Sequence, residues 1–361
     1  MIRFFSTQHL TLEDRGILGS FSINDPVESG PNDITRVTVD DDRTNEFLHA
    51  ASLRGVQMFH DAEFDRPPSQ PHCQGDGATR PAILGKLVNH RLGGENALIV
   101  IVDGGFDANS LSGINIEPII RTPFVALEPR SHGNMCAWDA NLGAPQATLA
   151  DLTVRSGRLI RSSDVLQGFR ILQGLTNELS RYSAWVVSIS LEVSLPSLDR
   201  LLPTSVRLTQ NPLHPLSVMA DVLAGHGFDV LIAGGNQGCS PDPYIAGLGM
   251  HPRVITVGAA DVNDLVVPLS ARGPHGSTKP DIVSYTNMLH SQANGAGMVD
   301  DGTSAATALA AGLIASYRTA DVGRDRVSLS PDGLRADLTN IARMPPGGGL
   351  RPNTTYGWGI F

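Results

Sequence analysis

The sequence has few charged residues and no excess of basic ones. Charged side chains make up 17% of the 361 residues, hydrophobic ones make up 41%, and the formal net charge is −9. A chain of this length and composition can bury a large core, whereas disordered chains lack hydrophobic residues. The negative balance gives no electrostatic footprint for phosphate backbones or anionic lipids, so neither nucleic acid nor a membrane is expected as a partner.

Long hydrophobic runs and cysteines are also scarce. The longest apolar runs, such as 184–191 and 305–315, fall well short of the ~20 residues that span a bilayer, so no membrane span is predicted. The N-terminus carries too short an apolar patch for a secretory signal. The three cysteines, Cys73, Cys136 and Cys239, form an odd and sparse set, which is more typical of a reducing cytosol than of a disulfide framework. The sequence therefore predicts a cytoplasmic protein.

The first 94 residues differ from the rest of the chain. Alternation in 34–39 predicts a short strand, and residues 45–59 and 81–89 have apolar side chains near helical spacing. Residues 67–77 form a polar linker rich in proline and glycine. We interpret residues 1–94 as a small N-terminal extension that regulates or covers the later domain, or that binds a protein partner.

From residue 96 onward, predicted strands alternate with predicted helices. This order predicts an α/β domain over residues 95–361, with three layers: a mostly parallel sheet flanked by helices on both faces. Ligands bind beyond the carboxyl ends of such strands, so the polar residues after each strand are the candidates for chemistry. The apolar runs that predict strands are 97–102, 147–154, 184–191, 230–233 and 254–257, and helical patterns occupy 163–179 and 214–226.

Four polar residues stand directly after such strands or near helix starts. Asp103 and Asn236 each follow a strand in a glycine-rich turn, and His132 begins a helical segment. Ser304 lies in the run GTSAATALAAG (302–312), where free backbone N–H groups at a helix start favour developing negative charge. Alone, each residue is more often a turn former, a cap or a packed helix residue. Together they supply a nucleophile, a base, a carboxylate that orients the base, and an oxyanion donor.

In the order Asp, His, Asn, Ser, these residues resemble the subtilisin-like serine proteases. The resemblance runs from about residue 98 to residue 359. It implies the subtilisin-like fold and a serine endopeptidase that works through an acyl-enzyme. Further similar stretches are 142–149, 251–259, 269–274, 279–282 and 356–359.

The resemblance also assigns the roles within the site. Ser304 is the nucleophile, His132 is the general base, and Asp103 holds and stabilises the imidazolium. Asn236 and the Ser304 N–H form the oxyanion hole. Cysteine nucleophiles at Cys136 or Cys239 are the alternative, and we prefer Ser304 because its motif is the better one.

A peptide substrate is expected to add a strand between two segments of the chain. The resemblance places Ser156, Gly157 and Arg158 on one side, and Ser190, Leu191 and Glu192 on the other. Glu192 stands where the family usually has glycine. Its carboxylate either lines the pocket for the residue before the cut bond and favours Lys or Arg there, or points to solvent.

No cofactor is predicted. Calcium sites are frequent in the family, but the sequence has no clear acidic loop, so a structural calcium is possible without being indicated. The changes beside Asp103 and His132, where Gly104 and Asn134 replace the usual residues, support a second hypothesis. It is a catalytically weak or inactive subtilisin-like fold that binds peptides or proteins. A dinucleotide-binding protein is a distant third, since the turn after Asp103 lacks the glycine fingerprint.

Overall fold

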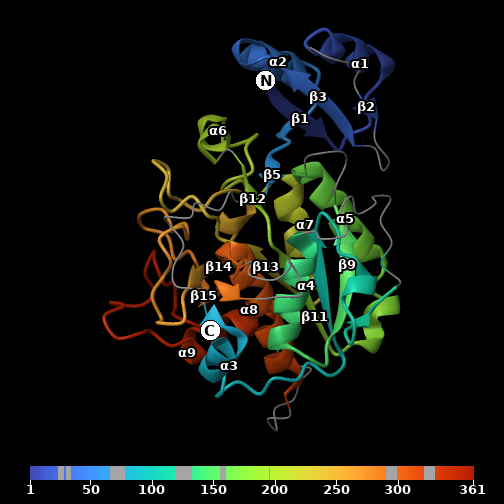
Figure 1. The fold of residues 1–361 in the computed structure, drawn as a ribbon. Helices are drawn as coiled ribbons and strands as arrows, with labels where there is room; N and C mark the ends of the chain where they lie inside the picture. The colour runs from blue at the N-terminus through green and yellow to red at the C-terminus, as the bar shows by residue number, and fades with distance from the viewer. Residues whose placement is uncertain are drawn as a thin grey trace.

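A parallel sheet of seven strands forms the centre of the molecule (Figure 1). The computed structural model describes residues 1–22, 28–29, 34–65, 78–118, 120, 132–154, 160–194, 196–289, 299–320 and 330–361. The strand order is β15-β14-β13-β11-β7-β9-β8, which confirms the predicted α/β class. The strands are β7 (Ala97–Asp103), β8 (Asn115–Ile116), β9 (Thr148–Thr153), β11 (Ala184–Ile189), β13 (Phe228–Ala233), β14 (Ile255–Ala260) and β15 (Ile282–Tyr285).

Strand β7 shows why the central strands read as unbroken apolar runs. All of its residues are buried, and alternate side chains enter two different hydrophobic clusters. Ile99 and Ile101 belong to the cluster on one face of the sheet, and Val100 and Val102 to the cluster on the other. A strand covered on both faces has no position for a polar side chain until it ends.

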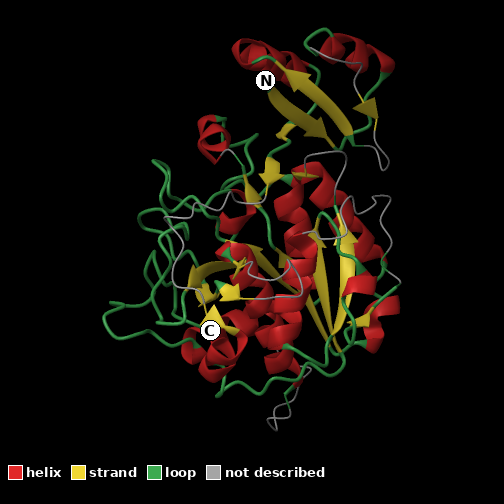
Figure 2. Cartoon of the chain, viewed as in Figure 1, coloured by secondary structure: helices red, strands yellow, loops and turns green. Residues whose placement is uncertain are grey.

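Helices cover both faces of the sheet (Figure 2). Residues of α4 (His132–Gly143) and α8 (Gly302–Thr319) share one cluster with α3 (Arg80–Lys86) and α9 (Pro331–Ile341). Residues of α5 (Ser162–Gly174) and α7 (Pro215–Gly225) belong to the other. The predicted three layers are therefore confirmed.

Helices α4 and α8 pack closely because glycines lie at their contact. A Cβ on Gly312 would overlap the Ala140 carbonyl oxygen, and a Cβ on Gly143 would lie 2.7 Å from the Leu309 oxygen. The small residues after Ser304 therefore serve the packing of two helices. The helix that begins at His132 is held directly against the helix that carries Ser304.

The described residues among the first 61 form a separate small sheet, drawn above the main body in Figure 1 and called here the N-terminal unit. Its hydrophobic core also includes Leu202 and Val206 from the later chain. The strand order is β2-β3-β1-β4, and β1 pairs antiparallel with both β3 and β4. Strand β3 confirms the strand predicted at 34–39, whereas the sequence patterns did not reveal β1. The elements are β1 (Ile2–Ser6), α1 (Leu12–Gly19), β2 (Glu28–Ser29), β3 (Thr35–Val39), α2 (Thr44–Leu53) and β4 (Phe59–His60).

Helix α2 is shorter than the sequence suggests. The helix predicted over 45–59 ends at Leu53, and Gly55 follows with a φ of 66°, in the left-handed region that stops a helix. The chain then enters β4. Later, α3 confirms the helix predicted near 81–89, and its Ile83 is buried in the core cluster beneath α4 and α8.

The remaining elements are short. Strand β6 (Ala78–Thr79) pairs with β16 (Met288–Leu289), which also pairs with β17 (Val299–Asp300) just before α8. The other short elements are β5 (Glu63–Asp65), β10 (Ile160–Arg161), β12 (Glu192–Val193) and α6 (Pro196–Leu201).

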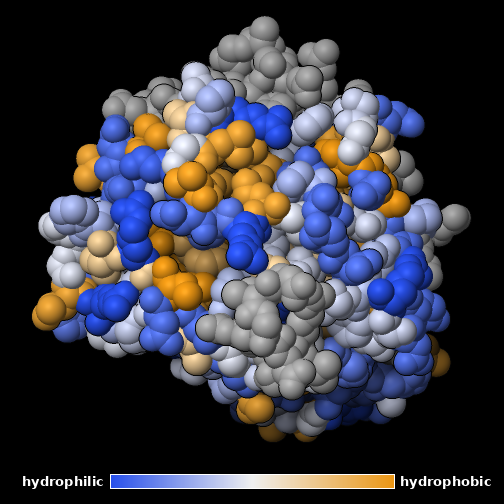
Figure 3. All heavy atoms as spheres, turned by 90° about the horizontal axis from the view of Figure 1, so that it is seen from below, coloured by the Kyte–Doolittle hydropathy of each residue, from blue (hydrophilic) through white to orange (hydrophobic). Residues whose placement is uncertain are grey.

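On the face away from the N-terminal unit, hydrophilic side chains separate the hydrophobic patches (Figure 3). Within the described residues, no helix combines the length and apolar character needed to cross a membrane.

Cys136 is a free, buried thiol, and Cys239 takes part in a disulfide bond. This bond differs from the expectation drawn from the sparse set of cysteines, because the spacing of so few cysteines does not reveal which of them meet in space. Disulfides are typical of oxidising compartments. The cytoplasmic location stays a prediction.

Candidate active site

Asp103 and His132 are in direct contact at the carboxyl edge of the sheet. Strand β7 ends at Asp103, whose Oδ2 lies 2.6 Å from Nδ1 of His132, the first residue of α4. The other carboxylate oxygen accepts the Gly104 N–H at 2.6 Å. Glycine is needed at 133 because a Cβ there would overlap the Gly105 carbonyl. The turn after the strand and the start of the helix thus fix both side chains.

The environment of His132 favours its charged form. Burial of the ring opposes protonation, but the Asp103 carboxylate and the Cys136 side chain together outweigh it, and the pKa of His132 lies well above its usual value. Because Nδ1 is turned to Asp103, Nε2 is the ring nitrogen left to exchange protons with another group. This is the arrangement that a general base needs.

Ser304 is buried near the start of α8 and is tied to the end of β11. Its hydroxyl donates to the Ser190 carbonyl at 3.0 Å, and the Ser190 hydroxyl donates to the Ser304 carbonyl at 3.2 Å. Ser190 directly follows β11. In the described part of the chain, the Ser304 hydroxyl is therefore directed to Ser190 and not to His132.

Asn236 lies against the chain that leads into Ser304. Its Oδ1 accepts the Thr303 N–H at 2.8 Å and the Thr303 hydroxyl at 2.9 Å. These two donors fix the orientation of the amide and leave Nδ2 as the donor of this side chain. Gly302, with a φ of 78°, provides the space, because a Cβ there would overlap Asn236 Nδ2.

Cys136, the alternative nucleophile considered from the sequence, is a neighbour of the site. It lies one helical turn after His132, with its Sγ 3.8 Å from His132 Nδ1 and 4.0 Å from Asp103 Oδ2. The thiol is therefore on the Asp103 side of the imidazole, away from Nε2, and Cys239 has no free thiol. Both facts oppose a cysteine nucleophile. The ligand atoms of the three groups lie within 4.8 Å of one another, close enough to share a metal ion. In this structure Asp103 and His132 are joined directly by a hydrogen bond.

Comparison with known proteins identifies the family of this chain. The sequence model of the subtilase family matches residues 143–359, more than half of the 361-residue chain. The chain is a subtilase. The matched range contains Asn236 and Ser304 and begins after Asp103 and His132.

Two solved structures are similar to this subtilase in fold. One is a lanthipeptide protease, with a TM-score of 0.51 and 17% identity over 76% of this chain and 88% of that chain. The other is the prenylagaramide maturation protease PagA, with a TM-score of 0.56 and 18% identity over 77% of this chain and 94% of that chain. At these identities the likeness concerns the fold.

The segments predicted to hold a substrate strand are partly described. Ser190 and Leu191 are buried behind the site, and Glu192 begins β12. The opposite segment, Ser156, Gly157 and Arg158, lies outside the described residues.

A strand from this subtilase's own N-terminal part lies beside β12. Strand β5 runs between β10 and β12 and is antiparallel to both. Phe64 is opposite Ile160 on one side and Val193 on the other, and Asp65 is opposite Glu192. An extended segment of the chain thus lies next to the edge predicted for the substrate.

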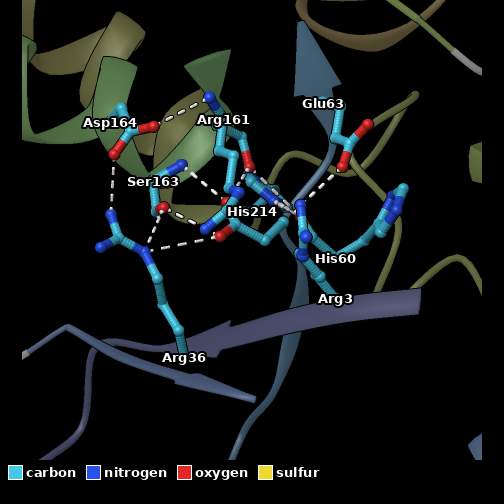
Figure 4. Close-up of polar contacts among 10 residues, drawn as sticks. Arg3, Arg36, His60, Glu63, Arg161, Ser163, Asp164 and His214 are labelled. Carbon is cyan, nitrogen blue, oxygen red and sulfur yellow. Dashed lines mark hydrogen bonds and ion pairs between the residues drawn. The ribbon is translucent and has the colours of Figure 1, made fainter. Parts of the chain in front are cut away.

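Charged and polar contacts fasten the N-terminal unit to α5 (Figure 4). Asp61 accepts the Ser163 N–H and the Ser163 hydroxyl, both at 2.9 Å, at the N-terminus of α5, where the helix dipole favours an anion. Arg36 of β3 donates to the Ser163 hydroxyl and to Asp164 Oδ1, again at 2.9 Å. These contacts join residues more than 100 positions apart.

Two buried histidines lie at the same junction. His60 Nδ1 is 2.7 Å from Asp199 Oδ1, and His214 Nε2 donates to the His60 carbonyl at 3.1 Å. His214 Nδ1 accepts the Leu216 N–H and caps α7, so the ring is held in its neutral form. Burial lowers the pKa of His214 to about 4.

Proposed function

We propose that this subtilase is a serine endopeptidase whose nucleophile is Ser304. The observation that carries the proposal is the direct contact of Asp103 with His132. This contact directs Nδ1 of the imidazole to Asp103 and contributes to the raised pKa of His132. The Ser304 hydroxyl first turns from the Ser190 carbonyl to His132 Nε2. His132 then takes the proton as the serine oxygen attacks the peptide carbonyl.

The oxyanion formed in this attack requires donors. Asn236 Nδ2 and the Ser304 N–H at the start of α8 supply them. His132 returns the proton to the leaving amine, and a water molecule, activated in the same way, releases the acyl group from Ser304. Asp103 keeps the imidazole in place through both steps.

The two unusual residues beside the site are compatible with catalysis. The Gly104 N–H donates to Asp103, and Asn134 accepts the Asp107 N–H at 2.6 Å. Both residues therefore stabilise the turn that holds Asp103.

The N-terminal unit, by this proposal, controls access to the site. Strand β5 occupies the place of a substrate strand beside β12, and the contacts of Arg36 and Asp61 hold the unit on α5. Release of β5 would free the main-chain groups of β12 for a peptide or protein substrate.

Labelling with a fluorophosphonate tests the serine directly. We expect covalent labelling of the wild-type chain and none of Ser304→Ala, with Ser190→Ala as the matched control, because it keeps the backbone carbonyl that Ser304 contacts. Equal labelling of wild type and Ser304→Ala, or none of the wild type at any pH, would favour the fold that binds without cleaving.

A further inference from the structure

The register of β5 shows how an extended chain approaches Ser304. Asp65 is opposite Glu192, so a chain that continues in this antiparallel register is opposite Ser190 two residues later. The Ser190 carbonyl accepts the Ser304 hydroxyl. The carbonyl of the substrate residue opposite Ser190 therefore lies beside Ser304. Residues two apart on a strand point to the same face, as do residues opposite each other on paired strands. The side chain of the residue before the cut bond and the side chain of Glu192 therefore share one face.

The Glu192 side chain extends across this face to the turn that follows β13. Strands β11 and β13 are neighbours, and the chain leaves them as Ser190–Glu192 and Gly234–Asn236. Glu192 Oε2 accepts the Asn236 N–H at 2.7 Å. The carboxylate thus joins the two segments that follow β11 and β13, directly beside the oxyanion donor.

Gly235 makes this position of the carboxylate possible. It has a φ of 107°, and a Cβ there would overlap Glu192 Oε2. The side chain of Glu192 is therefore seated on a surface that only glycine provides.

We propose that Glu192 closes the space that receives the substrate side chain before the cut bond, so that this subtilase cuts after glycine, alanine or serine. The proposal rests on the endopeptidase function proposed above. A large side chain must displace the carboxylate and leave the Asn236 N–H without its acceptor. Such a loss lowers the rate for large residues by roughly tenfold to a hundredfold. A lysine or arginine meets the same obstacle, so this proposal differs from both alternatives drawn from the sequence, a carboxylate that favours basic residues and one that points to solvent.

Single-residue diphenyl phosphonates carrying an alanine, phenylalanine or lysine side chain test this on the full-length chain. They label an activated serine and need only the space next to Ser304. Each rate is divided by the rate of labelling with the fluorophosphonate. Because this reagent has no amino-acid side chain, the division corrects for how accessible Ser304 is in each variant. We expect the alanine compound to react roughly ten times or more faster than the other two. Glu192→Gly removes both the obstacle and the acceptor of the Asn236 N–H, so we expect the rate of the phenylalanine compound relative to that of the alanine compound to rise by roughly the same factor.

Two variants control the experiment. Glu192→Gln keeps the size of the side chain and an oxygen acceptor, so it should retain the preference for alanine. Glu178→Gln, an exposed glutamate away from the site, should behave as wild type. A wild-type preference for lysine that Glu192→Gln removes, or a profile that Glu192→Gly leaves unchanged, overturns the proposal. Absence of fluorophosphonate labelling in every variant instead overturns the endopeptidase function, and this inference with it.

Discussion

Ser304 and Ser190 exchange two hydrogen bonds, each hydroxyl donating to the backbone carbonyl of the other residue. This pair connects the helix of the nucleophile to the end of the strand that leads to Glu192. Under the proposed function, the main chain of Ser190 sets the position of Ser304 along a bound peptide, and His132 activates its hydroxyl.

The triad is expected to act as one unit. Ser304→Ala, His132→Ala and Asp103→Asn should each reduce kcat by about 10⁴-fold or more, and the double variants should lose little beyond the worse single one. Steady-state kinetics on one peptide measures this. Cys136→Ala is the control and should retain activity, because its thiol faces Nδ1. Losses that multiply across the triad would contradict a shared step.

Replacement of the oxyanion donor should be milder. Asn236→Ala is expected to lower kcat on the order of 10²–10³-fold, a magnitude already known for the corresponding donor in another subtilase. Asn236 also accepts two bonds from Thr303. Thr303→Val removes the hydrogen bond from the Thr303 hydroxyl to Asn236 and keeps the one from the Thr303 N–H. It therefore measures the effect of orienting Asn236 separately from the effect of losing its Nδ2 donor. An equal loss in both variants would assign Asn236 a packing role.

The pH dependence should reflect the raised pKa of His132. Catalysis requires the neutral imidazole, so activity should rise with pH through that pKa, with its half-maximum above 6.5. Burial opposes the upward shift, Asp103 makes the largest contribution to it, and Cys136 adds to it. Cys136→Ala should therefore move the rise of kcat/KM toward lower pH. A half-maximum below 6.5 in the wild type would contradict the coupling.

Weakening β5 should expose the substrate edge. Phe64→Pro removes a main-chain donor from the middle of β5 and a buried ring, and should raise peptide hydrolysis by roughly tenfold or more. Arg54→Ala is the matched control, because Arg54 pairs with Glu13 and Asp14 inside the N-terminal unit. If hydrolysis falls in Phe64→Pro while the melting curve stays cooperative, β5 supports the site instead of covering it.

Acid should loosen the junction at His214. Its pKa is about 4 in the folded chain and near 6.5 when exposed, so the unfolded chain binds more protons between these values. The contribution of neutral His214 to the free energy of unfolding is fully present above pH 6.5. It is lost as the pH falls toward 4, and the loss amounts to about 3 kcal/mol at most.

Asparagine at position 214 has no group that titrates in this range, and its side-chain oxygen can still cap the N-terminus of α7. His214→Asn should therefore flatten the dependence of the unfolding free energy on pH between 6.5 and 4, as measured by urea denaturation. His226→Asn, at the exposed other end of α7, is the control and should retain the wild-type slope. An unchanged slope in His214→Asn would show that other groups cause the acid sensitivity.

The sequence by itself determined the α/β class, the central strands β7, β9, β11, β13 and β14, and the positions of the four candidate residues along the chain, whereas it gave no signal for the strands β8 and β15 at the edges of the sheet. Apolar runs with no polar residue are typical of strands buried on both faces, as in β7, and the first polar residue after such a run marks the strand end. Asp103 and Asn236 could be located by this rule, and His132 and Ser304 by the small or capping residues at helix starts. These signals are local, since each depends on a few neighbours in the chain.

Only the tertiary structure decided what lies beside the nucleophile. Strand β5 has three residues and no pattern of its own, and its partners in β10 and β12 follow it by about 100 residues or more. The direction of Glu192 depends in the same way on Gly235 and Asn236, which lie in the turn after β13. Pairing register and side-chain direction are fixed by such distant partners, and a linear sequence carries no local signal for them.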